Sequence, residues 1–160
     1  MKAASIKEIK EEVQTLNPAA LSEIIMRLGK FKKENKELLS YLLLYKNDER
    51  RYIAEIKESM HIMFTDVNIK ASYITKKNVR KILRSTNRYI KYTAEKETEI
   101  ELLIFFIEEF NGLGLNISKN ITLQKMYSSV MSRIQKSILA LHEDLQYDYS
   151  KRFAKLQEKL

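Results

Sequence analysis

Hydrophobic residues recur every three or four positions along most of the chain, a spacing that predicts helices. Residues 72–93 show the pattern most clearly. At 100° per residue, one arc of about 120° collects the less polar side chains. They are Val79, Ile82, Leu83, Thr86, Tyr89, Ile90 and Thr93. Cations collect on the opposite side, so the sequence predicts an amphipathic helix with one buried face and one basic face.

Capping residues divide the rest of the chain into further helices. Ser5 followed by Glu8 is a capping-box pattern, and Asn17 before Pro18 is typical of a helix N-terminus. Gly29 is a plausible C-terminal stop for the second helix. We expect helices at about 6–16, 18–29, 33–45, 48–67 and 94–111, and a last helix from residue 118 to the end.

The last predicted helix contains neither Gly nor Pro after residue 118. Its apolar residues recur at intervals of eleven, which is three turns at 3.67 residues per turn, so the stripe stays nearly straight. The members are Leu123, Ile134, Leu145 and Leu156, and Tyr127, Ile138, Tyr149 and Leu160. We expect one domain over 1–145, with 146–160 as a helical extension that projects or forms a dimer contact.

An offset of 61 residues aligns 27–45 with 88–106 without gaps. Each segment reads as a helix, a short turn and a helix that passes from acidic to apolar. Two such pairs predict an all-α antiparallel array of about seven helices, arranged as a short α-α superhelix. The array resembles HEAT and armadillo repeats in architecture only, because their signature residues are not evident. The alternative is a chance alignment of two amphipathic helices.

The composition supports a helical protein and excludes several classes. Three Gly and one Pro in 160 residues are too few for the turns of an all-β protein. The absence of Cys excludes disulfides and thiolate chemistry. The N-terminus lacks the apolar run of a signal peptide, and residues 102–107 fall far short of the roughly 20 that span a membrane. We expect a soluble cytoplasmic protein with no membrane partner.

The positive charge is concentrated between Val67 and Ala94. This stretch holds eight cations and no Asp or Glu, and eight equals the net charge of the whole chain, +8. The cations are Lys70, Lys76, Lys77, Arg80, Lys81, Arg84, Arg88 and Lys91. Like charges at i,i+4 oppose their own helix by a few tenths of a kcal/mol each. Something negative, either a ligand or another part of the protein, is therefore expected to face them.

Six of these cations are the candidate residues for binding nucleic acid or another anion. They are Lys76, Lys77, Arg80, Lys81, Arg84 and Arg88. Tyrosines at 73, 89 and 92 flank them, as aromatic residues do where bases stack, although Tyr89 also fits a packed core. The competing interpretation is internal pairing with Glu95 and Glu99 in a helical hairpin, each exposed pair contributing about 0–1 kcal/mol.

The sequence shows no pattern of catalysis or metal binding. His61 and His142 lie far apart, and neither has helix-spaced partners that would complete a metal site. No Gly-rich phosphate loop is present, and no Ser or Thr is marked as a nucleophile. We therefore expect a non-enzymatic protein with no catalytic, cofactor-binding or metal-binding residues.

Two functions from different classes follow. The first is a helical protein-interaction or scaffold module that binds another protein or itself, as a homodimer through its C-terminal helix. The alternative is sequence-nonspecific binding of nucleic acid or another anionic ligand through the basic helix over 72–93. Specific reading of bases is not expected, because no recognised base-reading motif accompanies the charge.

Overall fold

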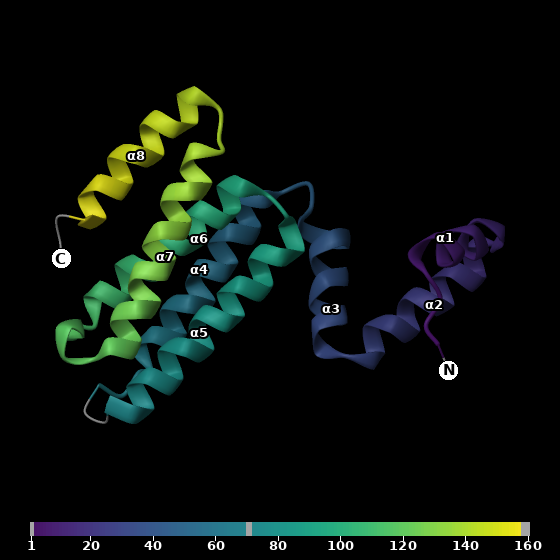
Figure 1. The fold of residues 1–160 in the computed structure, drawn as a ribbon. Helices are drawn as coiled ribbons and strands as arrows, with labels where there is room; N and C mark the ends of the chain where they lie inside the picture. The colour runs from purple at the N-terminus through teal and green to yellow at the C-terminus, as the bar shows by residue number, and fades with distance from the viewer. Residues whose placement is uncertain (1, 70–71, 158–160) are drawn as a thin grey trace. The chain divides into compact units, whose positions relative to one another are not determined.

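Helix-forming side chains and well-placed caps make most of the chain helical (Figure 1). The computed structural model describes residues 2–69 and 72–157, and within these residues it contains no strand. The elements are α1 (Ile6–Thr15), α2 (Pro18–Phe31), α3 (Lys33–Ser40), the π-helical turn η1 (Tyr41–Tyr45), α4 (Glu49–Thr65), α5 (Ser72–Thr93), α6 (Lys96–Gly112), the 3-10 turn η2 (Ile117–Lys119), α7 (Ile121–Leu139) and α8 (Glu143–Gln157). The predicted all-α class is confirmed.

The chain divides into two compact units, unit 1 (Met1–Leu44) and unit 2 (Tyr45–Leu160). The helices after residue 44 share one core, whereas those before it contribute almost no buried residues. The organisation expected from the sequence, a domain over 1–145 followed by an extension, stays a prediction.

Unit 1 begins with the helix caps that the sequence predicts. The Glu8 backbone N–H donates to Ser5 Oγ at 3.3 Å, and the Ser5 N–H donates to Glu8 Oε2 at 2.6 Å, which forms the capping box of α1. Asn17 Oδ1 accepts from the Ala20 N–H at 2.9 Å, with Pro18 in the first turn of α2.

Gly29 does not end α2, so this expectation was wrong. The helix continues to Phe31, and Gly29 lies where α2 packs against α3. A Cβ atom at this position would lie 3.0 Å from Leu39 Cδ1. The missing side chain therefore allows the two helices of unit 1 to approach closely.

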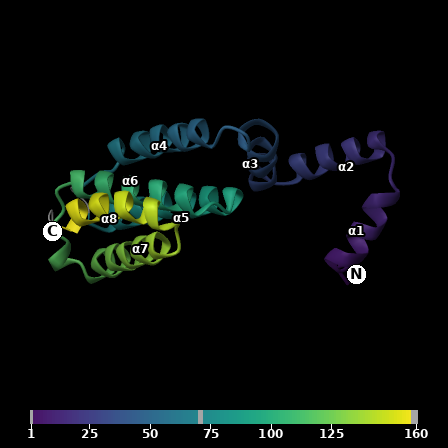
Figure 2. The same cartoon turned by 90° about the horizontal axis from the view of Figure 1, so that it is seen from above.

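Helix α6 lies at the centre of unit 2 and contacts α4, α5, α7 and α8. Figure 2 shows α4 and α7 on opposite sides of it. Residues 102–107 in the middle of α6 are all apolar, and a helix segment that is apolar on all sides is normally buried. The fully buried side chains of α6 are Thr98, Ile100, Leu102, Leu103, Ile104, Phe106 and Ile107. Phe106 also packs edge-on against Phe64 of α4, with ring centroids 5.4 Å apart.

Two glutamates on α6 join it to its neighbours through ion pairs. Glu99 accepts from Arg133 Nε of α7 at 2.5 Å and from Lys96 Nζ at 3.1 Å. Glu101 accepts from Lys57 Nζ of α4 at 2.5 Å and from the Arg152 guanidinium of α8. Burial opposes ionisation of both carboxyls, but these hydrogen bonds outweigh it and hold the pKa of each below its ordinary value.

The single long C-terminal helix expected from the sequence is instead two helices, α7 and α8, so this expectation was wrong. The chain breaks at Ala140–His142, where the Gln146 side chain donates to the carbonyls of Leu139 and Leu141 at 3.3 and 2.7 Å. These bonds satisfy carbonyls that the end of α7 leaves free. The reversal lets α8 pack on α6 and α7, which an unbroken helix could not do.

The eleven-residue apolar repeat therefore belongs to two helices that face a shared core. Leu123 and Ile134 of α7 are buried, and so is Leu156 of α8, while Leu160 lies outside the described residues. Phe153 is also buried within this chain. In this conformation Phe153 and Leu156 are not available to a second chain. Self-association itself stays a prediction.

We predict that Glu101→Gln lowers the free energy of unfolding at pH 7 by about 1–3 kcal/mol, because it weakens hydrogen bonds to two cations. The folded pKa of Glu101 is lowered, so the stabilisation by its charge is fully present above the unfolded pKa of about 4.3. It is lost as the pH falls through the folded pKa. Urea unfolding followed by circular dichroism should show the difference from wild type shrinking in acid.

The exposed Glu97, one turn earlier on α6, gives the control variant Glu97→Gln. It should change the unfolding free energy by no more than about 0.5 kcal/mol. Equal effects of the two substitutions would contradict a structural role for the Glu101 ion pairs.

Candidate anion-binding site

Helix α5 turns one face into the core of unit 2 and leaves the opposite face to solvent. The buried side chains are Thr75, Val79, Ile82, Thr86, Ile90 and Thr93. The buried arc is narrower than predicted, because Leu83 and Tyr89 are only half-buried. The bounds of α5, Ser72–Thr93, agree with the sequence-based expectation.

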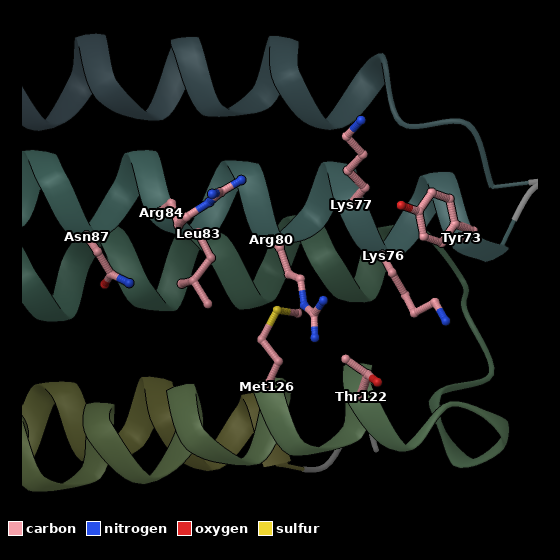
Figure 3. Close-up of a pocket in the computed structure, with 9 residues that line it drawn as sticks. All are labelled: Tyr73, Lys76, Lys77, Arg80, Leu83, Arg84, Asn87, Thr122 and Met126. Atoms are coloured by element: carbon pink, nitrogen blue, oxygen red, sulfur yellow. The ribbon is translucent and has the colours of Figure 1, made fainter.

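The exposed side of α5 and the start of α7 line a groove of about 510 Å³ (Figure 3). The groove is basic, and no carboxylate belongs to its lining. The lining residues are Tyr73, Lys76, Lys77, Arg80, Leu83, Arg84, Asn87, Thr122 and Met126. On α5 they recur every three or four residues, so they form one row along the helix beside α7.

The structure brings four of the six predicted cations together and separates the other two. Lys76, Lys77, Arg80 and Arg84 all line the groove. We name these four side chains the basic stripe. Lys76 and Arg84 are eight residues apart, so the stripe extends roughly 12 Å along the helix axis. In Figure 3 the Arg80 side chain points towards Met126 of α7.

The two remaining candidates lie elsewhere on α5. Lys81 lines a smaller hollow on the side of α4, together with Asp66 and Asn78. The Arg88 guanidinium lies over the Tyr89 ring, 5.3 Å from its centroid. Lys70, which belongs to the same charged stretch of sequence, lies outside the described residues.

The basic stripe makes no ion pair or hydrogen bond with residues that the structure describes, and Lys77, Arg80 and Arg84 are exposed. Of the two acids expected from the sequence to pair with it, Glu99 pairs instead with Arg133 and Lys96, and Glu95 makes no ion pair with these four side chains. The internal pairing considered from the sequence therefore does not occur for the stripe.

Four lining residues were not predicted from the sequence as part of the site: Leu83, which was assigned to the buried arc, and Asn87, Thr122 and Met126. Asn87 Oδ1 accepts from Arg133 Nη1 at 2.6 Å, and Arg133 is itself held by Glu99. This contact fixes the amide orientation and leaves the Asn87 NH₂ group as a donor. Thr122 and Met126 reach the groove only through the packing of α7, for which the sequence carries no signal.

The three tyrosines near the basic helix occupy different environments. Tyr73 is 74% exposed and lines the groove near Lys76 and Lys77. Tyr89 and Tyr92 pack edge-on against each other, with ring centroids 6.2 Å apart, and both are half-buried. Tyr73 is therefore the tyrosine whose ring face is accessible beside the basic stripe.

The histidines lie apart from this groove. His61 Nδ1 lies 3.0 Å from Glu109 Oε2, and His142 Nδ1 lies 3.5 Å from Asp144 Oδ2. Nowhere in residues 2–69 and 72–157 do three His, Asp or Glu side chains gather as a metal site would require. Within the same residues, no helix has the length and apolar character to cross a membrane.

The groove thus presents four cations, one amide donor and one hydroxyl, flanked by an exposed aromatic ring. No protein-family model, curated protein or solved structure matches this chain. A function is therefore proposed below from the residues that line the groove.

We predict that Arg80→Gln leaves the unfolding free energy unchanged or raises it by up to about 1 kcal/mol. Arg80 has cations at both i−4 and i+4, Lys76 and Arg84, and each such repulsion costs a few tenths of a kcal/mol. The control is Lys125→Gln on α7, because Lys125 is exposed and has no charged residue at i±3 or i±4. It should give no gain when both variants are unfolded in urea. A clear loss of stability in Arg80→Gln would show that the stripe serves the fold.

Proposed function

We propose that unit 2 binds phosphate-bearing polyanions, with nucleic acid as the principal ligand, in the groove between α5 and α7. The observation that carries the proposal is a stripe of four cations without acidic partners, in a groove whose lining contains no carboxylate. Charges placed at i,i+4 spacing destabilise their own helix. A polyanion that faces the basic stripe would offset this destabilisation.

Each part of the groove suits a phosphate backbone. Lys and Arg contact phosphate oxygens without reading sequence, and the Asn87 amide and Thr122 hydroxyl can donate to the same oxygens. The exposed Tyr73 ring offers a surface on which an unpaired base can stack. A single strand can use both the cations and the Tyr73 ring, because its unpaired bases are free to unstack and turn towards the ring. Single-stranded nucleic acid is therefore the favoured form.

The first test is the salt dependence of binding. Fluorescence anisotropy with labelled mixed-sequence single-stranded RNA, at about 50 and about 200 mM salt, should give a log–log slope near −2.8 for four phosphate contacts. The triple variant Lys76→Gln, Arg80→Gln, Arg84→Gln should weaken binding and flatten this slope by about 2.

A matched triple variant separates groove binding from general charge attraction. Lys46→Gln, Lys125→Gln and Lys136→Gln remove the same charge from exposed positions of unit 2 outside the groove. This variant should keep most of the affinity and the slope. If it loses as much as the groove variant, or if the wild-type chain binds nothing at low salt, the groove is not a nucleic-acid site.

A second test concerns Tyr73. Replacing Tyr73 by Ala should reduce the affinity for a single strand by about 1–3 kcal/mol, because base stacking on an aromatic ring contributes that amount. Affinity for a duplex of the same length should hardly change, since its bases stay stacked. Tyr92→Ala, at a tyrosine outside the groove lining, is the control. Equal losses for single strand and duplex would contradict base stacking.

A second candidate function is the protein-interaction module, in which helical repeats bind a partner. The observation that favours it is the exposed apolar surface of unit 1, where Leu43 and Leu44 are 72% and 68% exposed. The superhelical repeat stays a prediction. Its aligned apolar positions differ in environment, because Leu103 and Ile104 in α6 are fully buried whereas their counterparts Leu42 and Leu43 are exposed.

A further inference from the structure

Unit 1 has almost no core of its own. Of its described residues, 2–44, Tyr41 is the one that is buried. Eleven large hydrophobic side chains of this unit are instead exposed: Ile6, Ile9, Val13, Ile24, Ile25, Met26, Leu28, Phe31, Leu42, Leu43 and Leu44. Small units usually need disulfides, a metal or an oligomeric partner in addition to their core. The chain has no Cys, and the described residues hold no metal-ligand cluster.

Four of these exposed side chains line a groove between α2 and the segment formed by α3 and η1. The groove has a volume of about 650 Å³ and lies entirely within unit 1. Its apolar lining residues are Ile25, Met26, Leu39, Leu43 and Leu44. Gly29, which permits the close contact of α2 with Leu39, also belongs to the lining. A hollow between two helices suits the apolar face of a third helix.

Charge restricts what can fill this groove. Its lining includes four lysines, Lys30, Lys32, Lys33 and Lys36, and no acidic residue. Lys33 pairs with Glu37 at 3.6 Å, and Lys32 lies over the Phe31 ring. Lys30 and Lys36 are exposed and have no ionic partner among the described residues. An occupant with carboxylates beside its apolar stripe would satisfy these cations as it covers the apolar residues.

We infer that the unit 1 groove binds an acidic amphipathic helix of another protein, with an apolar stripe and Asp or Glu at its margins. This inference deepens the second candidate function, protein binding, and is independent of polyanion binding by unit 2.

Two other occupants fit the groove less well. A second copy of this chain offers α1, but two lysines, Lys7 and Lys10, accompany the three glutamates of that helix and reduce its acidity. A membrane surface would suit a convex apolar face better than a hollow between helices. Unit 1 also has no Trp, and its single Tyr is buried, so it lacks aromatic anchors for a membrane interface.

The test uses the full chain and two labelled helical peptides of about 18 residues, or roughly five turns. Both carry Leu at i, i+3, i+4 and i+7, and they differ in having Glu or Lys beside that stripe. Fluorescence anisotropy should show the Glu peptide binding at least about tenfold more tightly. Leu43→Asp should abolish this binding without unfolding the chain, because Leu43 is already 72% exposed.

Charge reversal provides the decisive comparison. The double variant Lys30→Glu, Lys36→Glu should prefer the Lys peptide, whereas Lys125→Glu, Lys136→Glu, a matched change on α7, should keep the preference for Glu. The triple Gln variant of the basic stripe should bind the Glu peptide as wild type does. That result separates failure of this inference from failure of the polyanion proposal.

Several outcomes would overturn the inference. Equal binding of both peptides would leave a docking groove but remove the acidic partner, and binding of neither would remove the groove as a docking site. A dimer in sedimentation velocity that Leu43→Asp dissociates would assign the groove to a second copy. Leu43-dependent binding to phosphatidylserine vesicles, with no binding of either peptide, would assign it to a membrane.

Discussion

The burial of α6 on several sides is the constraint on which the rest of unit 2 depends. Seven of its side chains are fully buried, and the helix contacts α4, α5, α7 and α8. Each of those helices therefore turns its apolar face towards α6 and its polar face away from it. Deleting buried methylene groups from such a core typically costs 2–5 kcal/mol for a large-to-small change. This arrangement also fixes the side of α5 that remains in solvent.

Helix α6 also carries two acidic side chains that form ion pairs with the neighbouring helices. Glu99 and Glu101 project from α6 towards α7, α8 and α4, where they bind Arg133, Arg152 and Lys57. These partly buried hydrogen-bonded pairs lower the pKa of both carboxyls. Neither of these acids pairs with the basic stripe on α5, because their ion pairs are with Arg133, Lys96, Lys57 and Arg152. Because Glu99 and Glu101 are used in ion pairs with other helices, the basic stripe remains available to bind an external anion.

The two units differ in how far their apolar side chains are buried. Unit 2 has a core of buried leucines and isoleucines centred on α6, whereas unit 1 leaves Leu43 and Leu44 exposed. Their surfaces also differ in chemistry. The unit 2 groove is polar and cationic with one exposed aromatic ring, and the unit 1 groove is apolar with cations in its lining. The two proposed ligands, a phosphate backbone and an acidic amphipathic helix, follow from this difference.

The helical class, the N-terminal caps at Ser5 and Asn17, and the extent of α5 follow from the sequence alone. These features depend on local spacing and on hydrogen bonds between residues three or four positions apart. The sequence also located the basic stretch, because the absence of Asp and Glu over 67–94 is a local property.

The way in which these parts combine depends on the packing of the helices against one another. No Gly or Pro marks the break between α7 and α8 in the sequence. The break occurs because α8, by folding back, buries apolar side chains and forms the Arg152–Glu101 ion pair. The distribution of the cations has the same origin: Lys76, Lys77, Arg80 and Arg84 line the groove beside α7, while Lys81 lines a hollow beside α4. Such outcomes depend on which helices lie next to each other, and a residue's own neighbours in sequence do not encode that.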